Sequence, residues 1–145
     1  EQIAAAQRLE KARQAAERVQ QEKDRKDRIL LDTFTNEDEM VLTRDGKIEA
    51  IEAIIRVTNG RTEKLKLRLS ELKTRAANIE RSGKPVSEKL NAEISEIRQQ
   101  IAQNFSYVKS RNSDQQLIRE QFEVDIARFR ELQAERFKLE QAAAK

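Results

Sequence analysis

Several residue types are scarce or absent in this chain of 145 residues, and each absence excludes a kind of chemistry. It has no cysteine, histidine or tryptophan, one proline and three glycines. Without cysteine there is no disulfide or thiolate metal ligand, and without histidine the usual general base and the commonest metal ligand are missing. No apolar run approaches the ~20 residues of a membrane-spanning helix. We therefore expect no catalytic residue, no cofactor, no metal site and no transmembrane segment.

The residues that are present indicate helices. Charged residues make up 38% of the chain and aromatic residues 4%, so a thick globular core is not expected. Apolar residues nonetheless recur at alternating steps of three and four, a spacing that disordered segments have no reason to keep. The pattern predicts an all-α fold, an elongated antiparallel helical hairpin of the coiled-coil type with an additional N-terminal helix.

The strongest turn signal is the segment SGKPVS at residues 82–87. Gly83 can adopt the left-handed conformation that ends a helix, and Pro85 lacks the amide hydrogen that a continuing helix needs. Ser87 directly precedes Glu88, so its hydroxyl can cap the next helix while the acid lies in the first turn. The chain is therefore predicted to reverse direction here.

A weaker signal upstream of the turn, near residue 35, divides the chain into two parts. Residues 1–34 are predicted to form an alanine-rich helical arm, and residues 35–145 an antiparallel coiled-coil hairpin. At the boundary, Thr35 followed by three acidic residues is typical of a helix N-terminus. Position 38 holds Asp in place of the Glu or Gln of a complete capping box, and no Gly or Pro is present. We expect a kink or short break there, with no tight reversal.

Both helices of the hairpin carry an apolar seam. The first seam comprises Val41, Arg44, Ile48, Ile51, Ile55, Thr58, Thr62, Leu65, Leu69, Leu72, Ala76 and Ile79. The second comprises Leu90, Ile94, Ile97, Ile101, Val108, Ile118, Phe122, Phe129, Leu132 and Leu139. Paired positions should add to roughly 169 in a hairpin closed by this turn. The polar waist at residues 58–62 then faces residues 109–114, either as a layer that fixes register or as a docking notch for another protein.

The N-terminal arm has a thinner seam of mostly small residues. With Ala5, the candidate association residues are Leu9, Ala12, Ala16 and Val19. The end of the last helix should cover residues 24–35, which leaves residues 1–23 without an intrachain partner. Because an isolated helix of this length is marginal in water, we expect this arm to pair with the same arm of a second molecule, as a homodimer, or to dock on another protein. The alternative is that it folds back across the hairpin.

The hairpin tip is basic. Residues 61–89 contain nine Lys or Arg against four Asp or Glu, and the candidate interaction residues are Lys64, Lys66, Arg68, Lys73, Arg75, Arg81 and Lys84. Such a patch can meet a membrane surface, nucleic acid or an acidic protein, or be a solvated face. Interrupting acids and the absence of a nearby aromatic residue for stacking argue against nucleic acid.

Two further clusters have structural interpretations. Residues 37–39 with Asp45 are acidic but lack the ligand alternation and central glycine of a calcium loop, so we interpret them as a solvated helix start. A group of large apolar side chains is expected to pack in the core and brace the kink: Phe34, Met40, Phe122, Phe129 and Phe137.

Four stretches together resemble a known kind of protein. They are RKDRILLDTF at 25–34, TRDGK at 43–47, IERSGKPV at 79–86 and DIARFREL at 125–132. Over about residues 25–133 the chain resembles the coiled-coil portion of uncharacterised exported proteins of Gram-negative bacteria. The resemblance implies a periplasmic or cell-envelope address, with the cytoplasm as the alternative, and no known enzymatic activity.

We therefore expect a non-enzymatic coiled-coil scaffold or protein–protein interaction module of the bacterial envelope. The alternative is a binder of anionic surfaces, membrane head groups or nucleic acid, through the basic hairpin tip. Because the chain opens with Glu1 and has no initiator methionine or signal peptide, we interpret it as a mature or excised fragment.

Overall fold

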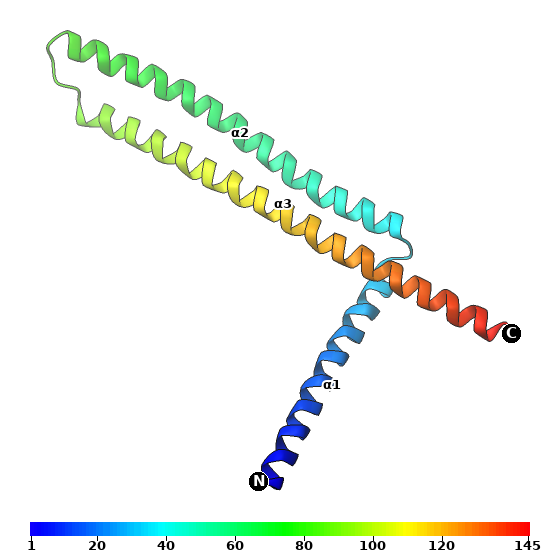
Figure 1. Ribbon diagram of the computed structural model, residues 1–145. Coiled ribbons are helices and arrows are strands. Elements are labelled where there is room, and N and C mark those ends of the chain that lie inside the picture. The colour runs from blue at the N-terminus through cyan, green and yellow to red at the C-terminus, as the bar shows by residue number, and fades with distance from the viewer. The chain divides into compact units, whose positions relative to one another are not determined.

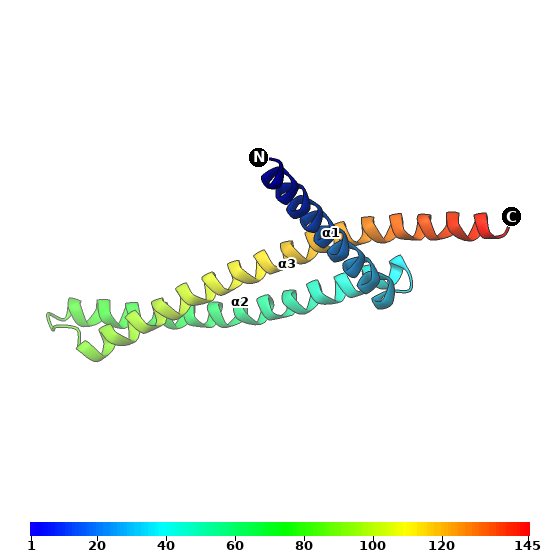
Figure 2. The same cartoon turned by 90° about the horizontal axis from the view of Figure 1, so that it is seen from below.

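The structure is a computed structural model that describes residues 1–145 as three helices (Figure 1). Helix α1 spans Gln2–Thr33, α2 spans Glu37–Arg81 and α3 spans Glu88–Ala143. There is no strand, and α2 and α3 run side by side in opposite directions (Figures 1 and 2). The chain is thus an all-α helical hairpin with an additional N-terminal helix, which confirms the predicted fold class.

The chain contains two compact units. The junction unit comprises Glu1–Arg44 and Glu120–Lys145, and the hairpin unit comprises Asp45–Arg119. The junction unit therefore contains the expected arm together with the start of α2 and the end of α3. The arm belongs to this unit because an ion pair from the last turns of α1 and an aromatic contact from Phe34, directly after it, both reach α3.

The turn between α2 and α3 forms as its sequence predicts. Gly83 has a φ of 81°, in the left-handed region that glycine tolerates. The Lys84 amide donates to the Ile79 carbonyl at 3.3 Å, the long closing bond of a Schellman motif. The Ser87 hydroxyl oxygen accepts the Leu90 amide at 3.2 Å and caps α3. Both helix ends at the turn are therefore satisfied by local hydrogen bonds.

The break between α1 and α2 is short, but its cap differs from the expected one. Phe34 is extended, with φ −121° and ψ 134°. Asn36, and not Thr35, is the N-cap: its Oδ1 accepts the Glu39 amide at 3.0 Å, while Glu39 Oε2 accepts the Thr35 amide at 2.7 Å. The prediction was one position early because it measured the box from Thr35. Counted from Asn36, the third helical residue is Glu39. Its amide is capped by Asn36, while its carboxylate accepts from the amide of Thr35, one residue before the N-cap.

The apolar core of the hairpin unit lies nearest the turn. Leu72, Leu90 and Ile94 are buried and share one cluster. The partly buried residues packed against this cluster are Leu69, Ala76, Ile79, Val86 and Ile97. All the residues of the predicted α2 seam are buried or half-buried, so the repeat identified the packed face of that helix.

The junction unit has a second apolar core. Met40 and Phe129 are almost fully buried, with Phe122 and Ile126 beside them. The rings of Phe34 and Phe122 meet edge to face with centroids 6.4 Å apart.

Two apolar residues expected to pack are exposed. Phe137 is 59% and Leu139 72% accessible to solvent. Both lie in residues 133–145, which are exposed throughout and have no helix beside them. The seam of α3 continues in sequence past the point where a partner is present, so its spacing alone could not show where packing stops.

Candidate functional site

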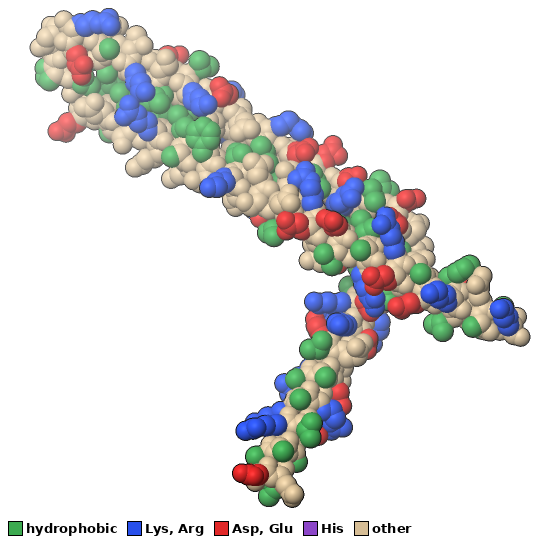
Figure 3. Space-filling view, in the orientation of Figure 1, with side chains coloured by type: hydrophobic (Ala, Val, Ile, Leu, Met, Phe, Trp, Pro, Cys, Tyr) green, Lys and Arg blue, Asp and Glu red, His purple; other side chains and the backbone are tan.

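An open apolar surface of the junction unit lies on α1. No residue of this helix is buried, and every residue from 1 to 26 is exposed. Leu9 is 72% and Val19 58% exposed, and Ala12 and Ala16 lie between them on the same face. Figure 3 shows apolar side chains uncovered along this helix. The candidate association seam is therefore accessible.

The opposite end of α1 is held against α3 by charge. The guanidinium of Arg128 donates to both carboxylate oxygens of Asp27, at 2.9 and 2.8 Å, and also to Glu131 at 2.7 Å. The hydrogen bonds from Arg128 lower the pKa of Asp27, and the bonds to Asp27 and Glu131 raise the pKa of Arg128. This bidentate pair fixes the last turns of α1, so the helix has one anchored end and one uncovered end.

The acidic residues at the start of α2 have structural partners. Glu37 accepts two hydrogen bonds from Arg130, one of them at 3.0 Å from Nε, and this lowers the pKa of Glu37. Glu39 completes the helix cap. No cluster of three or more acidic side chains is placed to hold a metal ion. None of the three helices is long and apolar enough to cross a membrane.

A polar layer crosses the hairpin unit at the expected waist. Thr58 and Thr62 are buried, and their hydroxyls donate to carbonyls one turn earlier in α2. At the waist, Asn104 Nδ2 donates to Thr62 Oγ1 at 3.1 Å. A second polar contact lies about four turns earlier in α2, where Gln115 Nε2 donates to the Ile48 carbonyl at 3.0 Å. Because each interhelical bond requires one pairing of α2 with α3, this layer fixes the register of the hairpin.

The partners in this layer differ from the predicted ones. Residues 109–114 were expected to face the waist, but the interhelical hydrogen bond to Thr62 comes from Asn104, which precedes that run. In a coiled coil each side chain packs between turns of the opposite helix, so one fixed sum of residue numbers does not hold along the whole hairpin. Polar character alone did not show which residues of α3 point inward.

The basic candidates do not form one patch. Residues 61, 68 and 75 are arginines spaced seven apart, so they lie along one side of α2, which we call the arginine flank. Lys66 and Lys73 are likewise seven apart and lie along the other side, the lysine flank. The remaining candidates are the exposed residues Lys64, Arg81 and Lys84.

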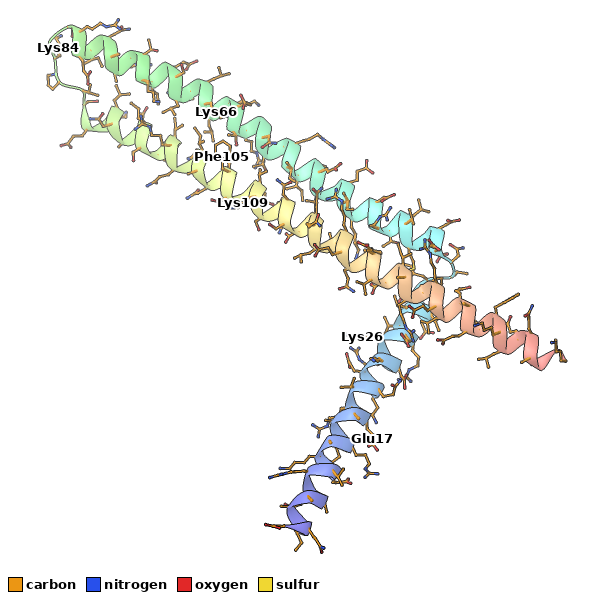
Figure 4. The ribbon with its side chains drawn as sticks, in the orientation of Figure 1. Glu17, Lys26, Lys66, Lys84, Phe105 and Lys109 are labelled. Atoms are coloured by element: carbon orange, nitrogen blue, oxygen red, sulfur yellow. The ribbon has the colours of Figure 1, made fainter.

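Some of these cations are engaged by neighbours on their own helix. Arg68 pairs with Glu71 at 3.5 Å, and Arg81 donates to Asn78 at 3.4 Å. Lys84 lies in the turn at the end of the hairpin unit (Figure 4). Exposed pairs of this kind are worth little energetically and leave the cations available to a partner.

An aromatic residue does lie beside the basic tip, contrary to the expectation. Lys66 Nζ lies 5.4 Å from the centroid of the Phe105 ring and 3.2 Å from Glu63. Figure 4 shows Lys66 on α2 and Phe105 on α3 directed toward one another. The ring is 56% exposed. It was missed because it is distant in sequence from the basic run, although the predicted pairing of the helices already placed it near residue 64.

The arginine flank contains a groove that the sequence did not indicate. One hollow of about 390 Å³ is lined by Ala53, Ile54, Val57, Thr58, Arg61, Asn104 and Tyr107. A neighbouring hollow of about 410 Å³ is lined by Arg61, Lys64, Leu65, Gln100, Gln103 and Asn104. Because Arg61 and Asn104 line both, the two hollows are adjacent parts of one surface between α2 and α3.

Comparison with protein-family models, with curated proteins and with solved structures finds no match for the chain.

Proposed function

We propose that the chain is a non-enzymatic coiled-coil scaffold, a protein–protein interaction module in which α1 is offered to a partner helix. The observation that carries the proposal is that α1 has an apolar seam but no buried residue. A helix gains most of its stability from packing of its apolar face, so an uncovered α1 gains by pairing. The resemblance of residues 25–133 to exported coiled-coil proteins supports an address in the bacterial envelope.

A second copy of the same helix fits the seam of α1. In an antiparallel pair centred between Ala12 and Ala16, Leu9 meets the partner's Val19 and the small alanines allow close approach. Arg8 then lies beside the partner's Glu22, with opposite charges. A parallel pair would place Arg8 near the partner's Arg13, with like charges. The charges therefore favour an antiparallel homodimer.

Sedimentation equilibrium of the full chain tests this proposal. We expect a monomer–dimer equilibrium that Leu9→Glu with Val19→Glu abolishes. Arg8→Glu or Glu22→Arg alone should each weaken dimerisation by about tenfold, since two like-charge pairs replace two opposite pairs. The double variant Arg8→Glu/Glu22→Arg should restore it. A full chain that remains monomeric at millimolar concentration contradicts self-pairing.

A second candidate function is binding to anionic surfaces through the hairpin unit. Its support is a charge excess, since residues 45–119 contain 15 Lys or Arg against 10 Asp or Glu. The exposed Phe105 ring beside Lys66 adds an aromatic contact. This candidate requires salt-sensitive binding to DNA or to vesicles of anionic lipid that is lost when Arg68, Lys73 and Arg75 are reversed to glutamate. Binding that does not change with salt concentration or with these charge reversals would contradict this second candidate function.

A further inference from the structure

The arginine flank departs from the usual pattern of a two-stranded coiled coil at one level. Flanking positions are ordinarily charged or polar, and the column of α2 that contains Arg61, Arg68 and Arg75 follows this rule. One heptad earlier the same column holds Ile54, which is 40% exposed. On α3, Tyr107 is 44% exposed and lines the same hollow, with Val57, 56% exposed, beside them. Both helices thus place large apolar side chains outside the core at one point.

The core beneath these apolar residues is polar. Thr58 and Asn104 form the floor of the hollow, and both use their side chains in the register-fixing layer. At this level the hairpin therefore has polar side chains in its interior and exposed apolar surface outside. A third helix laid along the groove would cover Ile54, Val57 and Tyr107 and would supply the apolar contacts that the two helices lack here.

The charge around the groove defines the chemistry of that helix. Arg61 and Lys64 line the two hollows, and no acidic residue does. The guanidinium carbon of Arg111 lies 5.6 Å from the centroid of the Tyr107 ring. The charge of Arg111 is balanced by an ion pair with Asp114. The uncompensated charge at the groove is thus positive. A partner with acidic residues beside its apolar stripe would be complementary in both respects.

We propose that this groove, centred on Ile54, Val57 and Tyr107 and bordered by Arg61 and Lys64, binds an acidic amphipathic helix of a partner protein to form a local three-helix bundle. The inference rests on the proposed role as an interaction module but uses a surface of the hairpin unit that is separate from α1. It assigns the groove to the class of helix-in-groove recognition sites, with anchors at helical spacing.

The chain carries its own reporter for this site. Tyr107 is the only tyrosine and there is no tryptophan, so tyrosine fluorescence intensity and anisotropy report on the groove alone. The probe is a synthetic helical peptide about three heptads long, with leucine at a and d, glutamate at e and g, and no aromatic residue. The control peptide has lysine at e and g. Titration of the full chain with the acidic peptide should give a saturable change in Tyr107 fluorescence, and the lysine peptide should give none.

Paired variants locate the binding. Ile54→Ser with Val57→Ser, both at exposed positions, should weaken binding by about tenfold or more, as loss of anchors does. Arg61→Glu with Lys64→Glu should weaken it similarly and admit the lysine peptide. The matched charge control, Lys66→Glu with Lys73→Glu on the lysine flank, should change affinity by less than about threefold. Circular dichroism confirms that each variant keeps its helix content.

Several results would overturn the proposal. One is the absence of any Tyr107 response, and another is equal weakening by the two charge pairs, which indicates general attraction. A response to a DNA duplex or to anionic vesicles but not to the peptide assigns the groove to an anionic polymer instead. Sedimentation and peptide titration of the same wild-type chain separate the two hypotheses: a wild-type chain that is monomeric yet binds the peptide contradicts α1 pairing only, and a dimeric chain without a Tyr107 response contradicts the groove only.

Discussion

At the scale of single residues, a few contacts decide where packing stops. The side chain of Asp27 is only 18% exposed and is held by two hydrogen bonds from Arg128, while residues 1–26 are exposed. Its pair with Arg128 joins α1 to α3 at the point where the exposed stretch of α1 ends. In the hairpin unit, Leu72 is the most buried residue of the cluster that contains Leu90 and Ile94, with 1% of its surface exposed.

Asp27→Asn should loosen the anchored end of α1. Removing the carboxylate leaves Arg128 without its bidentate partner, at a cost of about 1 kcal/mol after allowance for solvent screening, because Arg128 is 37% exposed. Amide exchange of residues 28–33 should become about fivefold faster. Glu10→Gln removes a solvent-exposed pair with Arg13 within α1 and serves as the matched control, with little expected change. Equal effects of the two variants would show that Asp27 does not anchor the helix.

The same pair should make the docking of α1 acid-sensitive. The pKa of Asp27 is lowered by Arg128, so its contribution is complete above the unfolded pKa of about 4 and decreases as the pH falls through the folded value. Amide protection of residues 28–33, corrected for the intrinsic rate, should therefore fall below about pH 4. The pKa of Glu37 is lowered by Arg130, so it adds a dependence of the same sign. Protection that is independent of pH in wild type would contradict this mechanism.

Leu72→Ala should be the more costly of two matched leucine truncations. Leu72 is 1% exposed and Leu67 is 68% exposed on the same helix. Truncating the buried residue removes its packing and leaves a cavity, which we expect to cost about 2–4 kcal/mol. Leu67→Ala should change the free energy of unfolding by less than about 0.5 kcal/mol. Urea unfolding followed by circular dichroism measures both, and similar values would show that the seam is not the core.

At the scale of helices, the sequence was informative where local rules act alone. Gly83 and Pro85 specified the turn, and the repeat of α2 identified its packed face, because both depend on neighbours in the chain. The cap at Asn36 was misplaced by one position within its own local motif, whereas the pairing of Thr62 with Asn104 and the exposure of Leu139 depend on which helix lies opposite. The groove at Ile54 and Tyr107 was missed for the same reason, since these residues are far apart in sequence and are joined only by the register of the hairpin.

Two glycines provide a direct test of the turn. Gly83 has a positive φ, so Gly83→Ala should destabilise the hairpin by about 1 kcal/mol through backbone strain. Gly60 lies within α2, and a β-carbon there meets nothing within 4 Å. Gly60→Ala should therefore stabilise the protein by about 0.5–1 kcal/mol. Chemical denaturation should give opposite signs for the two variants; the same sign would contradict the assigned roles of Gly83 and Gly60.

At the scale of the whole chain, the two units differ in the surface that they offer. The junction unit contains 14 Lys or Arg against 16 Asp or Glu and offers the apolar seam of α1. The hairpin unit has a net positive charge and offers a groove with apolar anchors. The register of the hairpin is fixed by its own polar contacts, whereas residues 1–26 of the junction unit are all exposed. This difference between the two units is compatible with the proposed interaction module, in which the hairpin is stable alone and α1 gains its packing partner by association.

Amide hydrogen exchange of the full chain, measured at increasing protein concentration, tests the central claim most directly. If α1 obtains its packing partner from a second copy, protection of residues 3–23 should rise with concentration, while protection of the cores around Leu72 and Phe129 stays constant. In Leu9→Glu/Val19→Glu the first segment should exchange rapidly at every concentration. Strong protection of residues 3–23 that persists unchanged in the most dilute wild-type sample would contradict the account, because it would require an intrachain partner for α1.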